Sequence, residues 1–313
     1  MSLDKASEII WTECMGLKKG EHALVVCDTP LEKIGYNLFE KAVNLGSEAF
    51  LLEMTPLKIH GTEPKDLVVE AMKSADVIVI PTSTSFTHTE ARKKANAEGA
   101  RVSTLPAVTE DVMERAIPVD YQKVRERSEK IAELLDSADS AHLYTEKGTD
   151  LTLPLKGREA IPDFGIYHNK GDFGNLPAGE AYIAPLEGGS EGRLVVDGSI
   201  ASIGKLKEVV TITVKKGMAA KIENCPELEK KLDEHGKMAR NIAELGVGTN
   251  DKAQVTGNVL EDEKVMGTVH VAVGNNASLG GVVDVPIHLD CIILNPTLEI
   301  DDERIIEDGK WQV

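Results

Sequence analysis

The residues whose types and spacing could carry chemistry lie in the second half of the sequence. His288 and Asp290 stand two positions apart in V-P-I-H-L-D, and His270 lies in the apolar run Thr268–Val273. Side chains at positions i and i+2 of a strand point to the same face, so a strand over Ile287–Leu294 directs His288 and Asp290 to one side. Imidazole and carboxylate groups that converge from strand ends bind zinc, cobalt, manganese or ferrous iron. This spacing predicts a metal site.

Three glutamates extend the candidate set. Glu180 follows P-A-G, Glu244 lies in A-E-L-G-V-G-T-N, and Glu263 lies in D-E-K-V-M-G. We expect Glu244 at the end of a helix, before a glycine turn that lets the backbone approach a ligand closely. Glu180 by itself is typical of an exposed turn. A buried Asp290 requires a partner, and either a cation or a histidine held by the carboxylate can be that partner.

The composition is typical of a globular protein and argues against several kinds of partner. The chain has 313 residues, 42% of them hydrophobic, and a net charge of −17. An excess of negative charge repels phosphate backbones and anionic lipid, so we expect neither nucleic-acid nor membrane binding. No apolar run reaches the roughly 20 residues of a membrane span. The four cysteines lack C-x-x-C spacing, so neither a disulfide framework nor a zinc ribbon is predicted, and a reducing cytoplasm is the expected location.

The first part of the chain, residues 1–140, alternates apolar strands with helices. Such alternation predicts βαβ units on a parallel sheet, and hence a doubly wound α/β domain. The expected strands are 22–28, 49–54, 76–81 and 101–105, and the expected helices are 3–17, 30–45, 64–74, 87–98 and 119–138. No G-x-G-x-x-G or Walker motif follows the first strand, so no nucleotide cofactor is predicted.

The second part, residues 141–313, predicts a strand-rich α+β domain that carries the metal site. Short β-type runs separated by glycine turns are typical of antiparallel pairing. The expected elements are a hairpin over 142–155, strands within 193–203 and 209–222, and a main helix over 226–245. No G-x-S-x-G elbow or H-E-x-x-H helix is present, so serine-nucleophile and zincin chemistry are disfavoured.

Four blocks of this second part together resemble the aminopeptidase T and aminopeptidase S family of two-metal leucyl aminopeptidases. The blocks are N-L-P-A-G-E-A-Y-I-A-P, A-E-L-G-V-G-T-N, G-T-V-H-V-A-V-G and H-L-D, in the same order and placement. The resemblance covers the second domain, and the first domain in architecture only. It implies a metal-ligand set made of Glu180, Glu244, His270, His288 and Asp290. It also implies that Glu263 corresponds, with an offset, to a further family glutamate.

The resemblance implies a cytoplasmic, homodimeric metallo-aminopeptidase that acts on small peptides. Two divalent ions (zinc, cobalt or manganese) would activate a water molecule, with Glu244 or Glu263 as the general base. Two departures bear on that reaction. The family tyrosine seven residues after the first histidine is Ala277 here, and the segment between His270 and His288 is short.

Two alternatives follow from the same residues. The superfamily also holds dioxygenases that cleave dihydroxypyridine rings, and the resemblance to them implies a ferrous site of two histidines and one carboxylate at His270, His288 and Asp290. The other alternative is a degenerate metal-binding protein without activity, for which the missing tyrosine is the hint. The number of candidate ligands favours two ions and hydrolysis.

Overall fold

The computed structural model describes residues 2–313, and its chain forms two compact units. The first unit comprises Met1–Gln122 and Phe164–Ala178, and the second comprises Lys123–Asp163 and Gly179–Val313. The predicted fold class, a parallel-sheet α/β part followed by a strand-rich α+β part, is confirmed. The units divide the chain differently from the two domains expected at residue 140, because the strand Phe173–Asn175 returns to pair with the sheet of the first unit.

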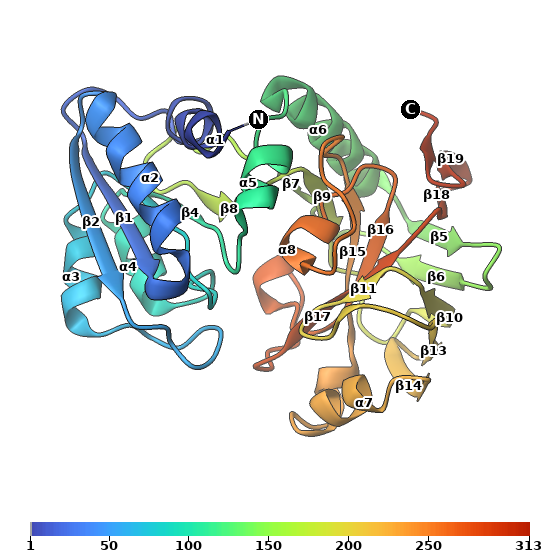
Figure 1. The fold of residues 1–313 in the computed structure, drawn as a ribbon. Helices are drawn as coiled ribbons and strands as arrows, with labels where there is room; N and C mark the ends of the chain where they lie inside the picture. Colours follow the sequence, from blue (N-terminus) through green and yellow to red (C-terminus); the bar gives the residue numbers. More distant parts are fainter. Residues whose placement is uncertain (1) are drawn as a thin grey trace. The chain divides into compact units, whose positions relative to one another are not determined.

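The first unit is built on a five-stranded parallel sheet with the order β2-β1-β3-β4-β8. Its strands are β1 (His22–Asp28), β2 (Glu48–Met54), β3 (Val77–Ile80), β4 (Arg101–Thr104) and β8 (Phe173–Asn175). Its helices are α1 (Leu3–Ile9, continued by a π-helical turn to Cys14), α2 (Glu32–Asn44), α3 (Asp66–Lys73), α4 (Glu90–Ala97) and α5 (Glu110–Ala116), and the long α6 (Tyr121–Ser137) leads into the second unit (Figure 1).

Helices cover the parallel sheet on both faces, which is why its strands are nearly continuous apolar runs. Val68 of α3 and Ala91 of α4 share one apolar cluster with Leu24 of β1 and Ile78 of β3. On the other face, α2 approaches β1 so closely at Gly35 that a Cβ there would lie 2.5 Å from the Sγ of Cys27. The unit therefore has the doubly wound architecture expected from its alternating pattern.

The second unit contains two antiparallel sheets. An eight-stranded sheet has the order β14-β13-β10-β6-β5-β18-β19-β20, with β5 (Ser140–Tyr144), β6 (Asp150–Pro154), β10 (Glu191–Val196), β13 (Val210–Lys215), β14 (Met218–Glu223), β18 (Thr297–Ile300), β19 (Glu303–Glu307) and β20 (Lys310–Trp311). A seven-stranded sheet has the order β12-β11-β17-β16-β15-β9-β7, with β7 (Ile161–Asp163), β9 (Glu180–Ile183), β11 (Ser199–Ile200), β12 (Gly204–Lys205), β15 (Ile242–Gly248), β16 (Val269–Gly274) and β17 (His288–Ile293). Short helices α7 (Pro226–Asp233) and α8 (Val259–Asp262) lie in the connections (Figure 1).

One face of the seven-stranded sheet packs into a large apolar core. Leu245, Val271 and Cys291 of this sheet belong to the same buried cluster as Leu151 and Leu194 of the eight-stranded sheet. Because side chains alternate along a strand, the residues between them must project from the opposite face. That opposite face carries the polar residues described below.

The helix predicted over 226–245 is wrong in its second half. Helix α7 ends at Asp233, a 3-10 turn covers Lys237–Arg240, and Ile242–Gly248 forms strand β15. The alternation of Glu244, Gly246 and Gly248 with Leu245 and Val247 is a strand pattern, but glycine at two of the polar positions hides it. Glu244 therefore lies within a strand and not at a helix end.

No helix in the part of the chain from residue 2 onward combines the length and the apolar character needed to cross a lipid bilayer.

Candidate metal centre

Five of the six residues singled out in the sequence meet on one face of the seven-stranded sheet. Cross-strand pairing sets Glu244 of β15, Ala272 of β16 and Asp290 of β17 in one row. Gly246 and His270 form the next row, and Gly248 pairs with Glu180 of β9 beyond them. His288 is opposite Gly274 at the start of β17. The register of four adjacent strands, and not sequence proximity, thus assembles the group.

Glu244 is at the centre of the group, between the two imidazoles. Its Oε1 lies 3.1 Å from Nε2 of His270, and its Oε2 lies 3.2 Å from Nε2 of His288. The same Nε2 of His288 is 3.2 Å from Oδ1 of Asp290. His270 also has its Nε2 3.4 Å from Oε2 of Glu180. Both imidazoles therefore present Nε2 to carboxylate oxygens.

Glu244, His270 and Asp290 each offer a ligand atom, and these atoms lie within 4.8 Å of one another. All three residues are buried, and His270 has no solvent exposure. His288 adjoins this triad through its contacts with Glu244 and Asp290. A buried cluster of two imidazoles and several carboxylates has the donor set of a transition-metal site. The triad supports the predicted metal site.

A hydrogen bond from Nδ1 of His288 leaves the other ring nitrogen available as a metal ligand. Its Nδ1 lies 2.7 Å from the carbonyl oxygen of Asn275, so Nδ1 carries the proton and donates it. Metal-binding histidines commonly donate their second ring N–H to a carbonyl or carboxylate in this way. Nε2 is then free to offer its lone pair. Nδ1 of His270 is buried without a hydrogen-bond partner among the described residues.

Glycine creates the space that the His270 ring occupies. A Cβ at Gly246 would lie 2.0 Å from Nε2 of His270, so the imidazole extends across the sheet directly over this glycine. A Cβ at Gly248 would lie 2.1 Å from the carbonyl oxygen of Val265. The turn after α8 therefore packs onto the sheet at Gly248. Both glycines are required by close approach rather than by backbone conformation.

The carboxylates hold positive charge in the cluster. Burial alone would lower the pKa of His270, but its hydrogen bond to Glu244 and the charges of Glu180, Glu244 and Asp290 raise this pKa to about 9. Burial also opposes the charge on His288, yet Asp290 and Glu244 raise its pKa well above the usual range. Burial opposes the ionised form of Asp290, but His288 and His270 keep its pKa below the ordinary value. A field that retains protons on both imidazoles is one that attracts a metal cation.

Glu263 lies beside the group but points to a residue that sequence analysis missed. Its Oε1 is 2.7 Å from Nζ of Lys264, whose ammonium also lies 2.5 Å from Oε1 of Glu180. Burial, partly offset by Lys264, raises the pKa of Glu263 to about 8. Lys264 follows Glu263 directly in the chain, and nothing in that pair alone distinguishes a buried lysine from a solvated one.

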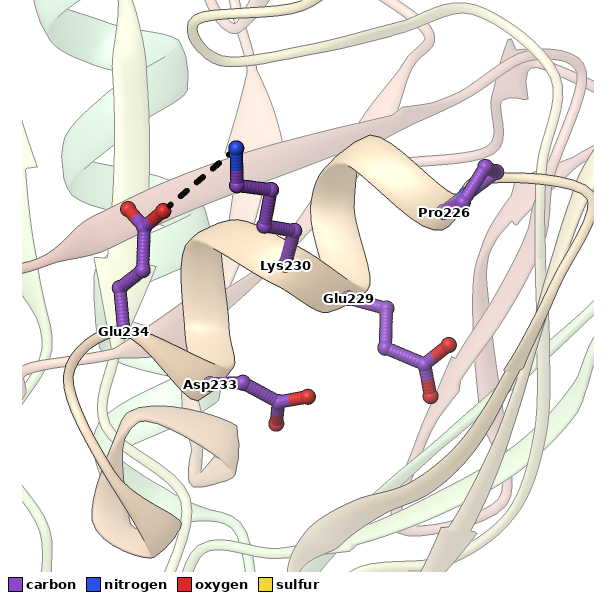
Figure 2. A pocket seen from close by; sticks show the side chains of 5 residues that line it. All are labelled: Pro226, Glu229, Lys230, Asp233 and Glu234. Atoms are coloured by element: carbon purple, nitrogen blue, oxygen red, sulfur yellow. Dashed lines mark ion pairs between the residues drawn. The ribbon is translucent and has the colours of Figure 1, made fainter.

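A shallow surface hollow of about 520 Å³ lies elsewhere on the second unit, along α7. Figure 2 shows its lining side chains projecting from a single helix, with an ion pair between Lys230 and Glu234 at 3.9 Å. None of the metal-site residues lines it. It has no group of converging donors, and we assign it no function.

Comparison with known proteins places the chain in a family of dioxygenases. The family model for 2,5-dihydroxypyridine 5,6-dioxygenase (NicX) matches residues 11–313. The 2,5-dihydroxypyridine 5,6-dioxygenase of Pseudomonas putida is 26% identical over 255 residues, which cover 76% of this chain and 71% of that protein.

Two solved structures share the fold. The structure of 2,5-dihydroxypyridine dioxygenase from Pseudomonas putida superposes with a TM-score of 0.83 at 20% identity, covering 99% of this chain and 96% of the other. AmpT from Thermus thermophilus superposes with a TM-score of 0.76 at 17% identity, covering 99% of each chain. The chain therefore shares its fold with both proteins.

The aminopeptidase prediction is wrong. The family model and the curated relative both name a dioxygenase, so the enzyme is expected among the oxidoreductases and not among the hydrolases or proteases. The dioxygenase and AmpT share the fold of this chain, so a resemblance at the level of the fold does not separate the two kinds of enzyme. With a family model that spans nearly its whole length, the chain belongs to the 2,5-dihydroxypyridine 5,6-dioxygenase family.

Proposed function

We propose that this protein is an iron(II)-dependent dioxygenase that cleaves the ring of a dihydroxypyridine. The observation that supports this most is that ligand atoms of His270 and Asp290 lie within 4.8 Å of each other, with Nε2 of His288 at 3.2 Å from Asp290, in a member of this family. Two histidines and one carboxylate with open positions are the ligand set of non-haem iron(II) oxygenases. By analogy with the relative's name, the bond cleaved is that between ring carbons 5 and 6, and both atoms of dioxygen enter the product.

The residues present suit a ferrous ion. Nε2 of His288 is directed to the cluster by the hydrogen bond from Nδ1 to Asn275, and Nε2 of His270 faces Glu244 and Glu180. His288, with its side chain 29% exposed, is the most accessible of the four central groups. The donors of the three remaining groups are buried. We therefore place the side open to substrate next to His288.

A bound ferrous ion would supply the one-electron chemistry that a closed-shell ring needs to react with dioxygen. The chain's own residues would hold this ion and orient its ligands. Glu244 contacts both imidazoles and keeps their Nε2 atoms turned inward. Its pKa is set by burial, which raises it, and by the stronger combined effect of hydrogen bonds from His270 and His288, which lower it. Glu244 thus accepts hydrogen bonds from the ring nitrogens before metal binding.

The proton that leaves a substrate hydroxyl needs an acceptor near the open side. Glu263 and Glu244 are the two acids predicted for general base work, and Glu263, with a pKa near 8, is protonated in much of the neutral range. Glu244, with a lowered pKa, is ionised there. We assign the acceptor role to Glu244. The cytoplasmic location and the homodimer expected from the sequence stay predictions.

The test is oxygen consumption with 2,5-dihydroxypyridine by protein loaded anaerobically with Fe²⁺, Mn²⁺ or Zn²⁺. We expect one molecule of dioxygen consumed per ring lost with Fe²⁺ only, and both atoms of ¹⁸O₂ in the opened product. The variant His288→Ala should lose both iron and turnover. His142→Ala is the matched control, because His142 pairs with Asp150 at 2.8 Å on β5 and β6 but lies outside the cluster. Iron-loaded protein that consumes no oxygen with any dihydroxypyridine isomer would contradict the proposal.

A further inference from the structure

Lys264 is buried at the edge of the metal cluster, and the proposed reaction gives it no task. Its side chain is 1% exposed, and its ammonium contacts Oε1 of Glu180 and Oε1 of Glu263. Lysine is almost never fully buried unless it is paired. This lysine has two carboxylate partners, of which one comes from β9 and one from the residue next to it in the chain.

Backbone hydrogen bonds hold the main chain of Lys264 in place. The carbonyl of Lys264 accepts a hydrogen bond from the amide of Asn250 at 2.9 Å, and its own amide donates to the carbonyl of Glu261 at 2.9 Å. The next residue, Val265, packs on Gly248, where no side chain intervenes. The main chain of Lys264 is therefore held against the sheet, and its two carboxylate partners hold the ammonium.

Two of the cluster's carboxylates thus already share a cation. Oε1 of Glu180 and Oε1 of Glu263 face the ammonium, and Oε2 of Glu180 lies 3.4 Å from Nε2 of His270. Glu244 and Asp290 face the two imidazoles. Carboxylates that bridge or flank a second divalent ion are what a two-metal hydrolytic centre needs. In this chain the ammonium lies in contact with the acidic side chains of both Glu180 and Glu263.

We propose that Lys264 takes the place of a second metal ion and restricts the centre to one. Its ammonium neutralises Glu180 and donates a hydrogen bond to Glu263, so one ion binds at the imidazole side. This inference deepens the proposed function, on which it rests for the single ion. Lys264 is a positioning residue: it controls which carboxylates are free and does not contact the substrate. Removing it leaves two buried acidic side chains without their shared cation, a state that a second divalent cation relieves.

The experiment counts bound Mn²⁺ on the full-length protein after chelation and anaerobic reloading. We expect one equivalent and an isolated-ion electron paramagnetic resonance signal for the wild type. Lys264→Met should bind two equivalents and give the exchange-coupled signal of ions about 3.5–4 Å apart. Lys264→Arg keeps the charge and should bind one. Two equivalents on the wild type, or one on a folded Lys264→Met, would overturn the inference.

Two further variants secure the result. Lys147→Met removes a lysine from the buried carboxylate of Asp197, away from the cluster, and should keep one equivalent. Glu180→Gln decides the question even if Lys264→Met does not fold. If Lys264 holds Glu180, this variant still binds one equivalent, whereas a loss of metal shows that Glu180 is a ligand and refutes the inference. Because no readout uses turnover, failure of the dioxygenase assay leaves this result independent.

Discussion

A single missing side chain at Gly246 decides where the His270 imidazole can lie. The ring occupies the volume that a Cβ would take, with Nε2 only 2.0 Å from the ideal Cβ position. Alanine is otherwise no worse than glycine inside a strand. We therefore expect Gly246→Ala to fold but to displace His270 and to weaken Mn²⁺ or Fe²⁺ binding by about 10–100-fold, the range seen when groups that orient ligands are changed. Competition with a chelating dye measures it.

The matched control for Gly246→Ala is the neighbouring change Val247→Ala. Val247 is fully buried on the opposite, core-facing side of the same strand. Its truncation should lower the unfolding temperature through lost apolar contacts and leave the metal affinity unchanged. Wild-type affinity in Gly246→Ala would show that the ring does not need this space.

At the scale of elements, the sequence predicts features that depend on local side-chain alternation. It does not predict features that depend on contacts between segments distant in the chain. The spacing of His288 and Asp290 correctly places them on one face, because alternation is local to a strand. The strand that carries Glu244 was mistaken for a helix, since glycine at positions 246 and 248 removes half of its alternating pattern. Lys264 was missed altogether. Its burial depends on a turn packing over Gly248, a contact that no nearby residue encodes.

The loop between β16 and β17 is held by hydrogen bonds to one half-buried acid, Glu187. Oε1 of Glu187 accepts hydrogen bonds from the side chain of Asn276 and the amide of Val282, each at 2.9 Å. Its other oxygen pairs with Arg158, which also donates to the carbonyl of Gly280. This loop begins at Asn275, whose carbonyl orients His288.

We expect Glu187→Ala to release this loop without unfolding the sheet. Hydrogen bonds to a charged acceptor contribute about 1.5–3 kcal/mol each, so losing two of them should speed amide exchange across residues 276–283 by one or more orders of magnitude. Hydrogen exchange with mass spectrometry measures this. Glu191→Ala is the control, since Glu191 also accepts a backbone hydrogen bond, from Lys216 at 2.7 Å, but outside the loop. Equal protection in Glu187→Ala and wild type would refute the role of Glu187.

At the scale of the whole molecule, the metal-free protein buries several carboxylates close to one another. The chain has a net charge of −17, and part of that excess is buried in one cluster. Protons on the imidazoles and on Glu263 offset it in the absence of metal. A bound divalent ion replaces them. Metal binding, protonation and folding are therefore linked, and stability should report on all three.

The direction of the pH dependence of stability follows from the pKa shifts of His270 and Glu263. The pKa of His270 rises from its usual 6.5 to about 9 on folding, so its contribution is complete below about pH 6.5 and is lost as pH rises through 9. Glu263, whose pKa rises from 4.5 to about 8, acts in the same direction, because folding favours its protonated form. The unfolding free energy of metal-free protein should therefore fall between pH 6.5 and 9, by on the order of 5 kcal/mol. Urea unfolding at several pH values measures this.

Two comparisons make that pH dependence specific to the cluster. The variant His270→Gln carries no proton to lose and should show a flatter profile over the same range. Saturating Mn²⁺ should reverse the slope, because metal ligands must be deprotonated and binding strengthens as pH rises. A metal-free wild type that becomes more stable from pH 6.5 to 9 would mean that the imidazoles are neutral in the folded protein. In that case the carboxylates would not keep the imidazoles protonated. The electrostatic argument that the cluster attracts a metal cation would then be wrong.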